Sequence, residues 1–214
     1  MTHKPRPKGS VIAALDIGSS KVACFIARVV DDHGGYEILG VGHQAAQGIK
    51  SGTITDLNAA EAAIRHTVHA AENMAAQAMK GYPLREVVIN VPGVHAHSQG
   101  LSVDVEISGQ EITDNDVQRA LAKAQDQSVG DDHELIHTIP VSYAIDGNQG
   151  VKEPRGMVGD RLEVDIHLVT GGHKPLRNVA SCIERSHLEV SALCLSGYAA
   201  GLSSLVEDEM DLGC

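Results

Sequence analysis

The residues of this chain that are best suited to chemistry form a short polar run, Asp16-Ile17-Gly18-Ser19-Ser20-Lys21, between two apolar segments. Glycine lets a ligand approach the backbone closely, and successive amides of a tight turn can converge on phosphate oxygens. The hydroxyls of Ser19 and Ser20 and the ammonium of Lys21 add donors, while Asp16 can orient Mg²⁺ through its water ligands. The run therefore predicts a phosphate-binding turn, although a plain hairpin with a solvated lysine would use the same residues.

Three predicted strands position this turn. Residues 11–17 and 21–30 are apolar, and residues 36–42 follow a segment rich in Asp and Gly that favours a turn. A helix should begin after Asp56 and end before Gly81. Its buried positions recur at steps of three and four: Leu57, Ala60, Ile64, Val68, Ala71, Ala75 and Ala78. Because most of them are alanine, a neighbouring element must pack close against this helix.

The sequence pattern changes near residue 95, where apolar and polar residues begin to alternate. The predicted elements after this point are a strand over 101–107, a helix starting at Thr113, a strand over 133–145, a loop over 146–160 and a strand over 162–168. They predict a small strand–helix–strand–strand subdomain inserted into the first domain. A helix from Lys174-Pro175, a strand over 190–195 and a helix over 197–207 complete the chain.

Composition excludes several classes of protein. The chain has 214 residues, 43% of them hydrophobic, which is enough for one large domain or two small ones. A formal net charge of −11 argues against general nucleic-acid binding. No apolar run approaches the roughly 20 residues that span a bilayer. Residues 1–10, which include Lys4, Arg6 and Lys8, are predicted to form a basic, flexible tail.

Other reactive side chains predict no further site. The four cysteines (Cys24, Cys182, Cys194 and Cys214) contain no Cys-x-x-Cys pair, so we expect reduced thiols in a cytosolic protein. His66 and His69 share a helix face, but no third ligand stands at metal-binding spacing, and we expect no metal site formed by protein ligands. The absence of a Gly-x-Ser-x-Gly run argues against a serine hydrolase, and we assign no catalytic residue.

A meander of three strands followed by a helix and a strand matches the first half of the actin, heat-shock-70 and sugar-kinase fold. Beyond that general match, the chain resembles the FtsA family of bacterial cell-division proteins from about Val11 to Cys214. The segments that carry this resemblance are 15–23, 38–42, 48–52, 139–146 and 156–159.

The resemblance implies an α/β fold: a partial actin/Hsp70-like core of ribonuclease-H type with an inserted strand–helix–strand–strand (SHS2) subdomain. Residues 11–94 and 168–214 would form the subdomain called 1A in this family, and residues 95–167 the inserted subdomain 1C. Asp16, Gly18, Ser19, Ser20 and Lys21 match the first phosphate-binding loop, which implies ATP with Mg²⁺ as the cofactor.

The resemblance also implies a role. FtsA proteins form an ATP-binding scaffold, with slow or absent hydrolysis, that polymerises on the cytoplasmic face of the inner membrane at the division site. They tether the FtsZ ring and recruit later division proteins such as FtsN, and the inserted subdomain contacts FtsN and neighbouring protomers. The family's second phosphate loop, main FtsZ-binding subdomain and carboxy-terminal membrane helix have no counterpart in these 214 residues. We therefore expect an amino-terminal portion that binds ATP weakly or not at all by itself.

Two relatives within the same superfamily are alternatives. One is a pilus-assembly ATPase similar to PilM, and the other is a sugar or acetate kinase. Segments 48–52 and 139–146 favour FtsA over PilM, and the long alternating insertion resembles FtsA rather than the kinases. Sequence beyond Cys214 would separate the first two, because a basic amphipathic helix after a flexible linker is typical of FtsA.

Overall fold

The computed structural model describes residues 6–212, apart from residues 32, 129 and 131. The chain divides into two compact units. The first, called the body, comprises the described residues up to His95 and from Lys174 onward. The second, called the inserted unit, comprises Ala96–His173.

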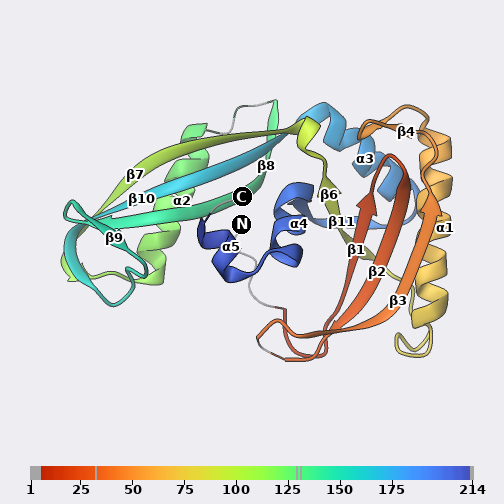
Figure 1. Ribbon diagram of the computed structural model, residues 1–214, viewed down its shortest axis with the longest axis horizontal. Helices are drawn as coiled ribbons and strands as arrows, with labels where there is room; N and C mark the ends of the chain where they lie inside the picture. The colour runs from red at the N-terminus through yellow and green to blue at the C-terminus, as the bar shows by residue number, and fades with distance from the viewer. Residues whose placement is uncertain (1–5, 32, 129, 131, 213–214) are drawn as a thin grey trace. The chain divides into compact units, whose positions relative to one another are not determined.

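A five-stranded sheet forms the centre of the body (Figure 1). Its strands are β1 (Val11–Ile17), β2 (Lys21–Val29), β3 (Tyr36–Ala45), β6 (Glu86–Val91) and β11 (Glu189–Leu195), in the order β11-β6-β1-β2-β3. The pairs β1–β2 and β2–β3 are antiparallel, whereas β1–β6 and β11–β6 are parallel. The carboxyl ends of β1, β6 and β11 therefore meet at one edge of the sheet.

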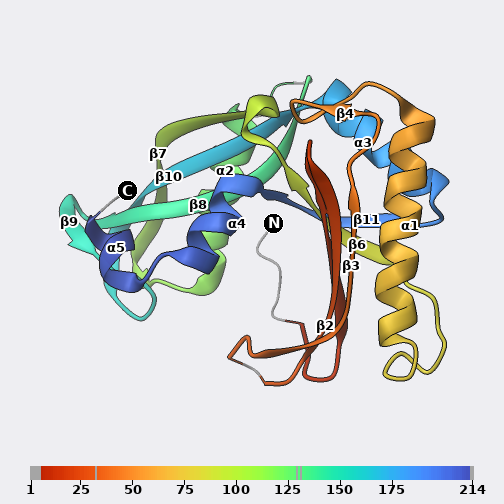
Figure 2. The same ribbon diagram turned by 45° about the vertical axis from the view of Figure 1, so that its right-hand side comes forward.

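Helix α1 (Leu57–Ala75) runs along one face of this sheet (Figure 2). As predicted, Asp56 caps it: the carboxylate accepts hydrogen bonds from the amides of Asn58 and Ala59 at 3.0 and 3.1 Å. The body's core lies between this helix and the sheet and includes Leu15, Ile26, Ile64, Val87 and Ile89. Helix α3 (His173–Arg185) adds Cys182 and Ile183 to the same core.

The alanine positions of α1 pack against glycines of β3, which confirms the predicted close contact. A Cβ atom at Gly40 would lie 2.2 Å from the carbonyl oxygen of Ala71, and one at Gly42 would lie 2.0 Å from that of Thr67. No real side chain tolerates such distances, so the glycines permit this close approach of helix and strand. Neither α1 nor any other helix in the described part of the chain has the length and hydropathy of a membrane span.

Short elements complete the body. Strands β4 (Ile49–Lys50) and β5 (Thr53–Ile54) pair as a small hairpin. A single helical turn, η1 (Gly93–His95), follows β6. Helices α4 (Ser196–Ser204) and α5 (Glu207–Leu212) follow β11.

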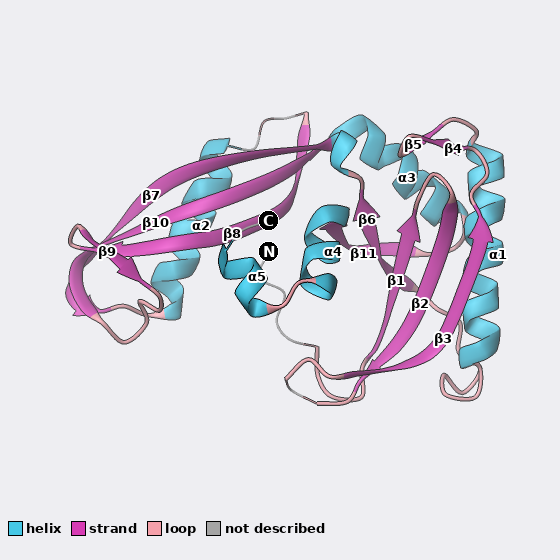
Figure 3. Cartoon of the chain, viewed as in Figure 1, coloured by secondary structure: helices cyan, strands magenta, loops and turns pink. Residues whose placement is uncertain are grey.

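The inserted unit is a four-stranded sheet with one long helix (Figure 3). Its elements are β7 (Ala96–Glu111), α2 (Asp114–Ser128), β8 (His133–Ile145), β9 (Asn148–Val151) and β10 (Val158–Gly172), and the strand order is β7-β10-β8-β9. Apolar residues of α2 and of the sheet form its core, among them Val103, Val117, Leu121, Val164 and Ile166. At the predicted start of α2, the Thr113 hydroxyl donates to the Asp116 carboxylate at 2.6 Å.

The structure corrects three sequence predictions. Residues 146–160 are not one loop, because β9 and the start of β10 lie within them. The inserted unit does not end at residue 167, because β10 stays paired with β7 up to Gly171 and with β8 up to Gly172. The flexible tail does not extend to residue 10, because the amide of Gly9 donates to the carbonyl of Val29 at 2.8 Å. Residues 1–5 of the predicted tail lie outside the described residues.

Candidate phosphate-binding site

The predicted phosphate turn joins β1 to β2 at the edge of the sheet where the parallel strands end. The amide of Gly18 donates to the carbonyl of Lys21 at 3.0 Å, which closes the turn. A Cβ at Gly18 would lie 2.9 Å from the same carbonyl oxygen, so a side chain here would force the turn open. The carbonyl of Ser20 accepts from the amide of Ala46 at 3.0 Å and ties the turn to the end of β3.

A second set of hydrogen bonds fixes the turn to the neighbouring strands. The side-chain oxygen of Asn90, next to last in β6, accepts from the amide of Ile17 at 2.7 Å. The Asn90 amide nitrogen in turn donates to the Ser196 hydroxyl at 3.2 Å, and Ser196 donates to the Val91 carbonyl at 3.0 Å. The Asn90 and Ser196 side chains thus join the carboxyl ends of the parallel strands β1, β6 and β11 in one polar network next to the turn.

The Ser19 side chain is oriented by the β4–β5 hairpin. Its hydroxyl oxygen accepts a hydrogen bond from the amide of Gly52 at 2.8 Å. A hydroxyl has one proton to donate, and that proton remains available to a ligand when the oxygen is held by a donor. Gly52 has φ of +75°, and a Cβ there would lie 2.9 Å from Cγ of Pro92. Glycine is therefore required at this position by conformation and by space.

All five residues predicted to bind the cofactor lie in or next to this one turn. The side chains of Asp16, Ser19, Ser20 and Lys21 are exposed, and Gly18 is half-buried. Within the described residues, neither Asp16 nor Lys21 takes part in an ion pair, so both charges remain available. Asp16 lies on the opposite face of β1 from the buried residues Leu15 and Ile17. An exposed carboxylate beside hydroxyl and ammonium donors fits a magnesium-bound phosphate.

The sequence reasoning missed Gly52, Asn90 and Ser196 as parts of this site. Asn90 and Ser196 each stand where an apolar strand ends, and polar residues at the ends of neighbouring parallel strands share one edge of a sheet. That signal was present in the sequence, but using it requires the strand order. Nothing in the sequence indicates that Gly52 meets Ser19, because the two residues are 33 positions apart.

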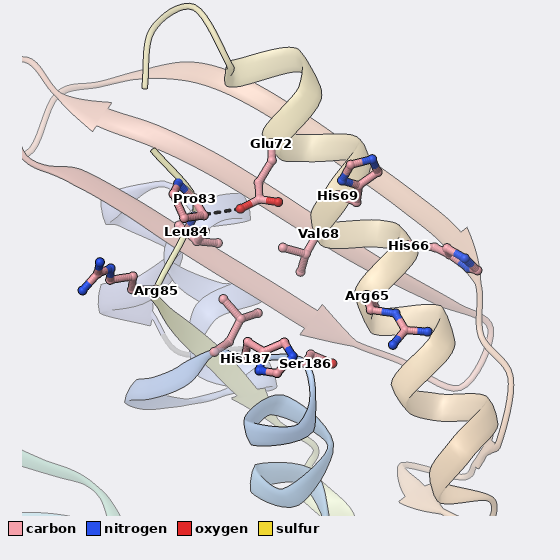
Figure 4. Close-up of a pocket in the computed structure, with 11 residues that line it drawn as sticks. Arg65, His66, Val68, His69, Glu72, Pro83, Leu84, Arg85, Ser186 and His187 are labelled. Atoms are coloured by element: carbon pink, nitrogen blue, oxygen red, sulfur yellow. Dashed lines mark hydrogen bonds between the residues drawn. The ribbon is translucent and has the colours of Figure 1, made fainter. Parts of the chain in front are cut away.

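A hollow of about 560 Å³ lies elsewhere in the body, between α1 and the segments that precede β6 and β11 (Figure 4). The carboxylate of Glu72, on α1, accepts a hydrogen bond from the amide of Leu84 at 2.7 Å and so links two walls of the hollow. This hollow adjoins the amino ends of β6 and β11, whereas Gly18 follows the carboxyl end of the parallel strand β1. The two features therefore lie at opposite edges of the sheet, and the hollow is not part of the phosphate site.

Other side chains offer little further chemistry. Within the described residues, no group of three or more His, Cys, Asp or Glu side chains is placed to hold a metal ion. Cys24, Cys182 and Cys194 are free thiols, and Cys214 lies outside the described residues. Burial, reinforced by the charge of Glu72, raises the pKa of the Cys24 thiol to about 12. Cys24 is therefore protonated and unreactive at neutral pH.

Residues 93–170 match the family described as the SHS2 domain inserted in FtsA. The cell division protein FtsA of Rhizobium meliloti (strain 1021) is 36% identical over 220 residues, covering 98% of this chain and 48% of that protein. FtsA of Escherichia coli (strain K12) is 33% identical over 203 residues, covering 95% of this chain and 47% of that protein. The chain belongs to the FtsA family of cell-division proteins. It spans about half the length of the curated FtsA relatives that it matches.

A solved structure titled "PilM-PilN type IV pilus biogenesis complex" has a similar fold, with a TM-score of 0.59 over 91% of this chain and 50% of that chain. Sequence identity is 11%, so PilM is related by fold and the likeness carries no function to this FtsA chain. Together with the SHS2 match, it confirms the predicted fold class: an actin-like α/β core with an inserted strand–helix–strand–strand subdomain.

Proposed function

We propose that this FtsA-family chain supplies the first phosphate-binding turn of an ATP-dependent scaffold for cell division. The observation that carries the proposal is the turn itself. It is closed by glycine, tied to β3 and β6, and presents two unpaired charges and an oriented hydroxyl at the carboxyl edge of a mostly parallel set of strands. Ligands of open α/β sheets bind at this edge.

Each residue of the turn has a distinct part in binding. Gly18 keeps the turn tight, because a side chain there would meet the Lys21 carbonyl, and Ser19 and Ser20 donate their hydroxyl protons to the phosphate oxygens. Lys21 places a positive charge beside the phosphate, and Asp16 holds the water ligands of Mg²⁺. When bound, Mg²⁺ neutralises part of the negative charge of the triphosphate.

One turn of this kind is too small for tight binding. Three charge-assisted hydrogen bonds contribute about 1.5–3 kcal/mol each. Association costs roughly 4–15 kcal/mol, and micromolar affinity needs about 8 kcal/mol net. We infer that these 214 residues alone bind ATP in the millimolar range or more weakly. Micromolar affinity then requires a second phosphate loop, on a partner lobe of the full-length protein.

The scaffold role follows from the family. We propose that the full-length protein polymerises on the cytoplasmic face of the inner membrane, tethers the FtsZ ring and recruits later division proteins such as FtsN. The inserted unit is suited to protein contacts, because α2 covers one face of its sheet while the other face carries exposed polar residues such as Arg161 and Asp165. Membrane attachment would come from the carboxy-terminal helix of this family.

Sedimentation of the full-length protein with vesicles of inner-membrane lipids tests the proposal. We expect Mg-ATP to increase the fraction in polymers, and Lys21→Ala to remove this response while leaving the melting temperature unchanged. When FtsZ is added to the wild-type protein and vesicles, FtsZ should appear in the pellet. Polymers that form equally with and without nucleotide would contradict nucleotide control, and FtsZ that stays in the supernatant would contradict tethering.

A further inference from the structure

Gly52 is held by hydrogen bonds on both sides of its Cα atom. Its amide donates to the Ser19 hydroxyl at 2.8 Å. Its carbonyl oxygen lies 3.0 Å from Nε2 of His95, and the same nitrogen lies 3.1 Å from the Thr53 hydroxyl. His95 is half-buried in η1, directly before Ala96, the first residue of β7. A continuous set of hydrogen bonds therefore runs from η1 through the β4–β5 hairpin to the phosphate turn.

Chemistry fixes which nitrogen of His95 carries the proton. A carbonyl oxygen can only accept a hydrogen bond, so the short contact with Gly52 requires an N–H at Nε2. The Thr53 hydroxyl is then a second acceptor of the same proton. This N–H exists both in the neutral Nε2 tautomer and in the doubly protonated ring.

We infer that His95 is a positioning residue for phosphate binding, acting on Ser19 through Gly52. Its N–H holds the peptide group that joins Gly52 to Thr53, and this restrains rotation about the Gly52 Cα bonds, which set the direction of the Gly52 amide toward the Ser19 oxygen. The Ser19 proton is then directed toward the ligand and away from the protein. Without His95 the hairpin keeps its residue pairs, Ile49 with Ile54 and Lys50 with Thr53, but Gly52 loses the hydrogen bond that restrains its carbonyl group. The inference rests on the proposed binding of Mg-ATP at this turn.

Calorimetric titration of the full-length protein with Mg-ATP tests the inference. His95→Ala should weaken binding about fivefold, the loss expected for one hydrogen bond. His95→Gln should stay within about twofold of wild type, because its side-chain amide can donate to the same carbonyl. His69→Ala is the matched control, since His69 is exposed on α1 away from the turn, and it should change nothing.

A double-mutant cycle separates positioning from a general structural effect. If His95 acts through Ser19, then adding His95→Ala to Ser19→Ala should weaken binding no further, whereas independent effects would multiply. If the effects of the two substitutions multiply, or if the His95→Ala protein binds Mg-ATP like wild type, the inference about His95 is overturned and the proposed function is not. A wild-type protein that does not bind Mg-ATP would overturn the proposed function as well.

Discussion

Asp16 and Lys21 carry opposite charges at the two ends of the phosphate turn, yet neither is neutralised within the described residues. Some other charges of the chain are paired, as at Arg155, which binds Glu153 at 2.9 Å and Asp114 at 3.0 Å. Unpaired charges beside a closed glycine turn are what a site for a magnesium-bound phosphate needs, because a site satisfied by its own protein would first have to break those contacts.

The metal role of Asp16 leads to a specific prediction. Asp16→Asn keeps the size of the side chain but removes the charge that holds the water ligands of Mg²⁺. We expect the full-length variant to bind Mg-ATP about tenfold more weakly than wild type does. In the presence of a chelator, its affinity for ATP should stay within about twofold of the wild-type affinity. Titration calorimetry under both conditions measures this. Equal losses with and without magnesium would show that Asp16 does not act through the metal.

A second residue-scale prediction concerns Asp165 in the inserted unit. Hydrogen bonds from the hydroxyls of Ser102 and Ser142 lower the pKa of Asp165 below its ordinary value. Because the folded pKa is lower than the unfolded one, the carboxylate stabilises the unit above about pH 4, and this contribution is lost as pH falls through the folded pKa. The Ser102→Ala/Ser142→Ala protein should show a higher pKa of Asp165 by NMR titration. An unchanged pKa would exclude the hydroxyls as its cause.

Residue types alone were sufficient to predict the turn but not the groups that support it. The run from Asp16 to Lys21 is local, and glycine, serine and lysine reveal their chemistry without the fold. Gly52 and His95 act through hydrogen bonds across 33 and 43 positions, respectively. Such contacts depend on how the β4–β5 hairpin packs next to the end of β1, and no pattern in the sequence predicts that packing.

At the scale of elements, the contact between α1 and β3 sets the geometry of the body. Gly42→Ala should destabilise the protein by about 1–3 kcal/mol, because the new methyl group would overlap the Thr67 carbonyl. Thermal and urea unfolding measure this loss. Gly197→Ala in α4 is the matched control, since a Cβ there meets nothing within 4 Å and alanine favours a helix. A Gly42→Ala protein as stable as wild type would contradict the close packing.

Element boundaries show where sequence patterns succeed and fail. Some patterns are strong local signals, and the structure has them. The apolar residues of α1 recur at steps of three and four, Asp56 caps this helix, and apolar and polar residues alternate in β7 and β10. The hairpin between β8 and β9 was missed, although Asp146-Gly147 is a strong turn signal and both residues have positive φ. The glycines that follow it suggested a loop, whereas Gly150 lies within β9 and Gly159 within β10.

At the scale of the whole molecule, the inserted unit should be separable from nucleotide binding. Its two ends are neighbours, because Ala96 pairs with Gly171 in the antiparallel ladder of β7 and β10. A short Gly-Ser linker between His95 and Lys174 can therefore replace Ala96–His173 in the full-length protein. We expect the protein with this deletion to bind Mg-ATP with an affinity within about threefold of wild type. It should no longer form polymers or respond to FtsN. Normal polymers in sedimentation would argue against an assembly role for the inserted unit.

The binding of Mg-ATP by the turn between β1 and β2 is tested most directly by titrating the full-length protein and its Lys21→Ala variant. One charge-assisted hydrogen bond contributes about 1.5–3 kcal/mol, which corresponds to roughly 10- to 100-fold in affinity. We predict micromolar binding by the wild-type protein and a loss of this size in the variant, with unchanged thermal unfolding. Equal affinity in the two proteins, or no binding by either, would contradict the assignment of the phosphate site.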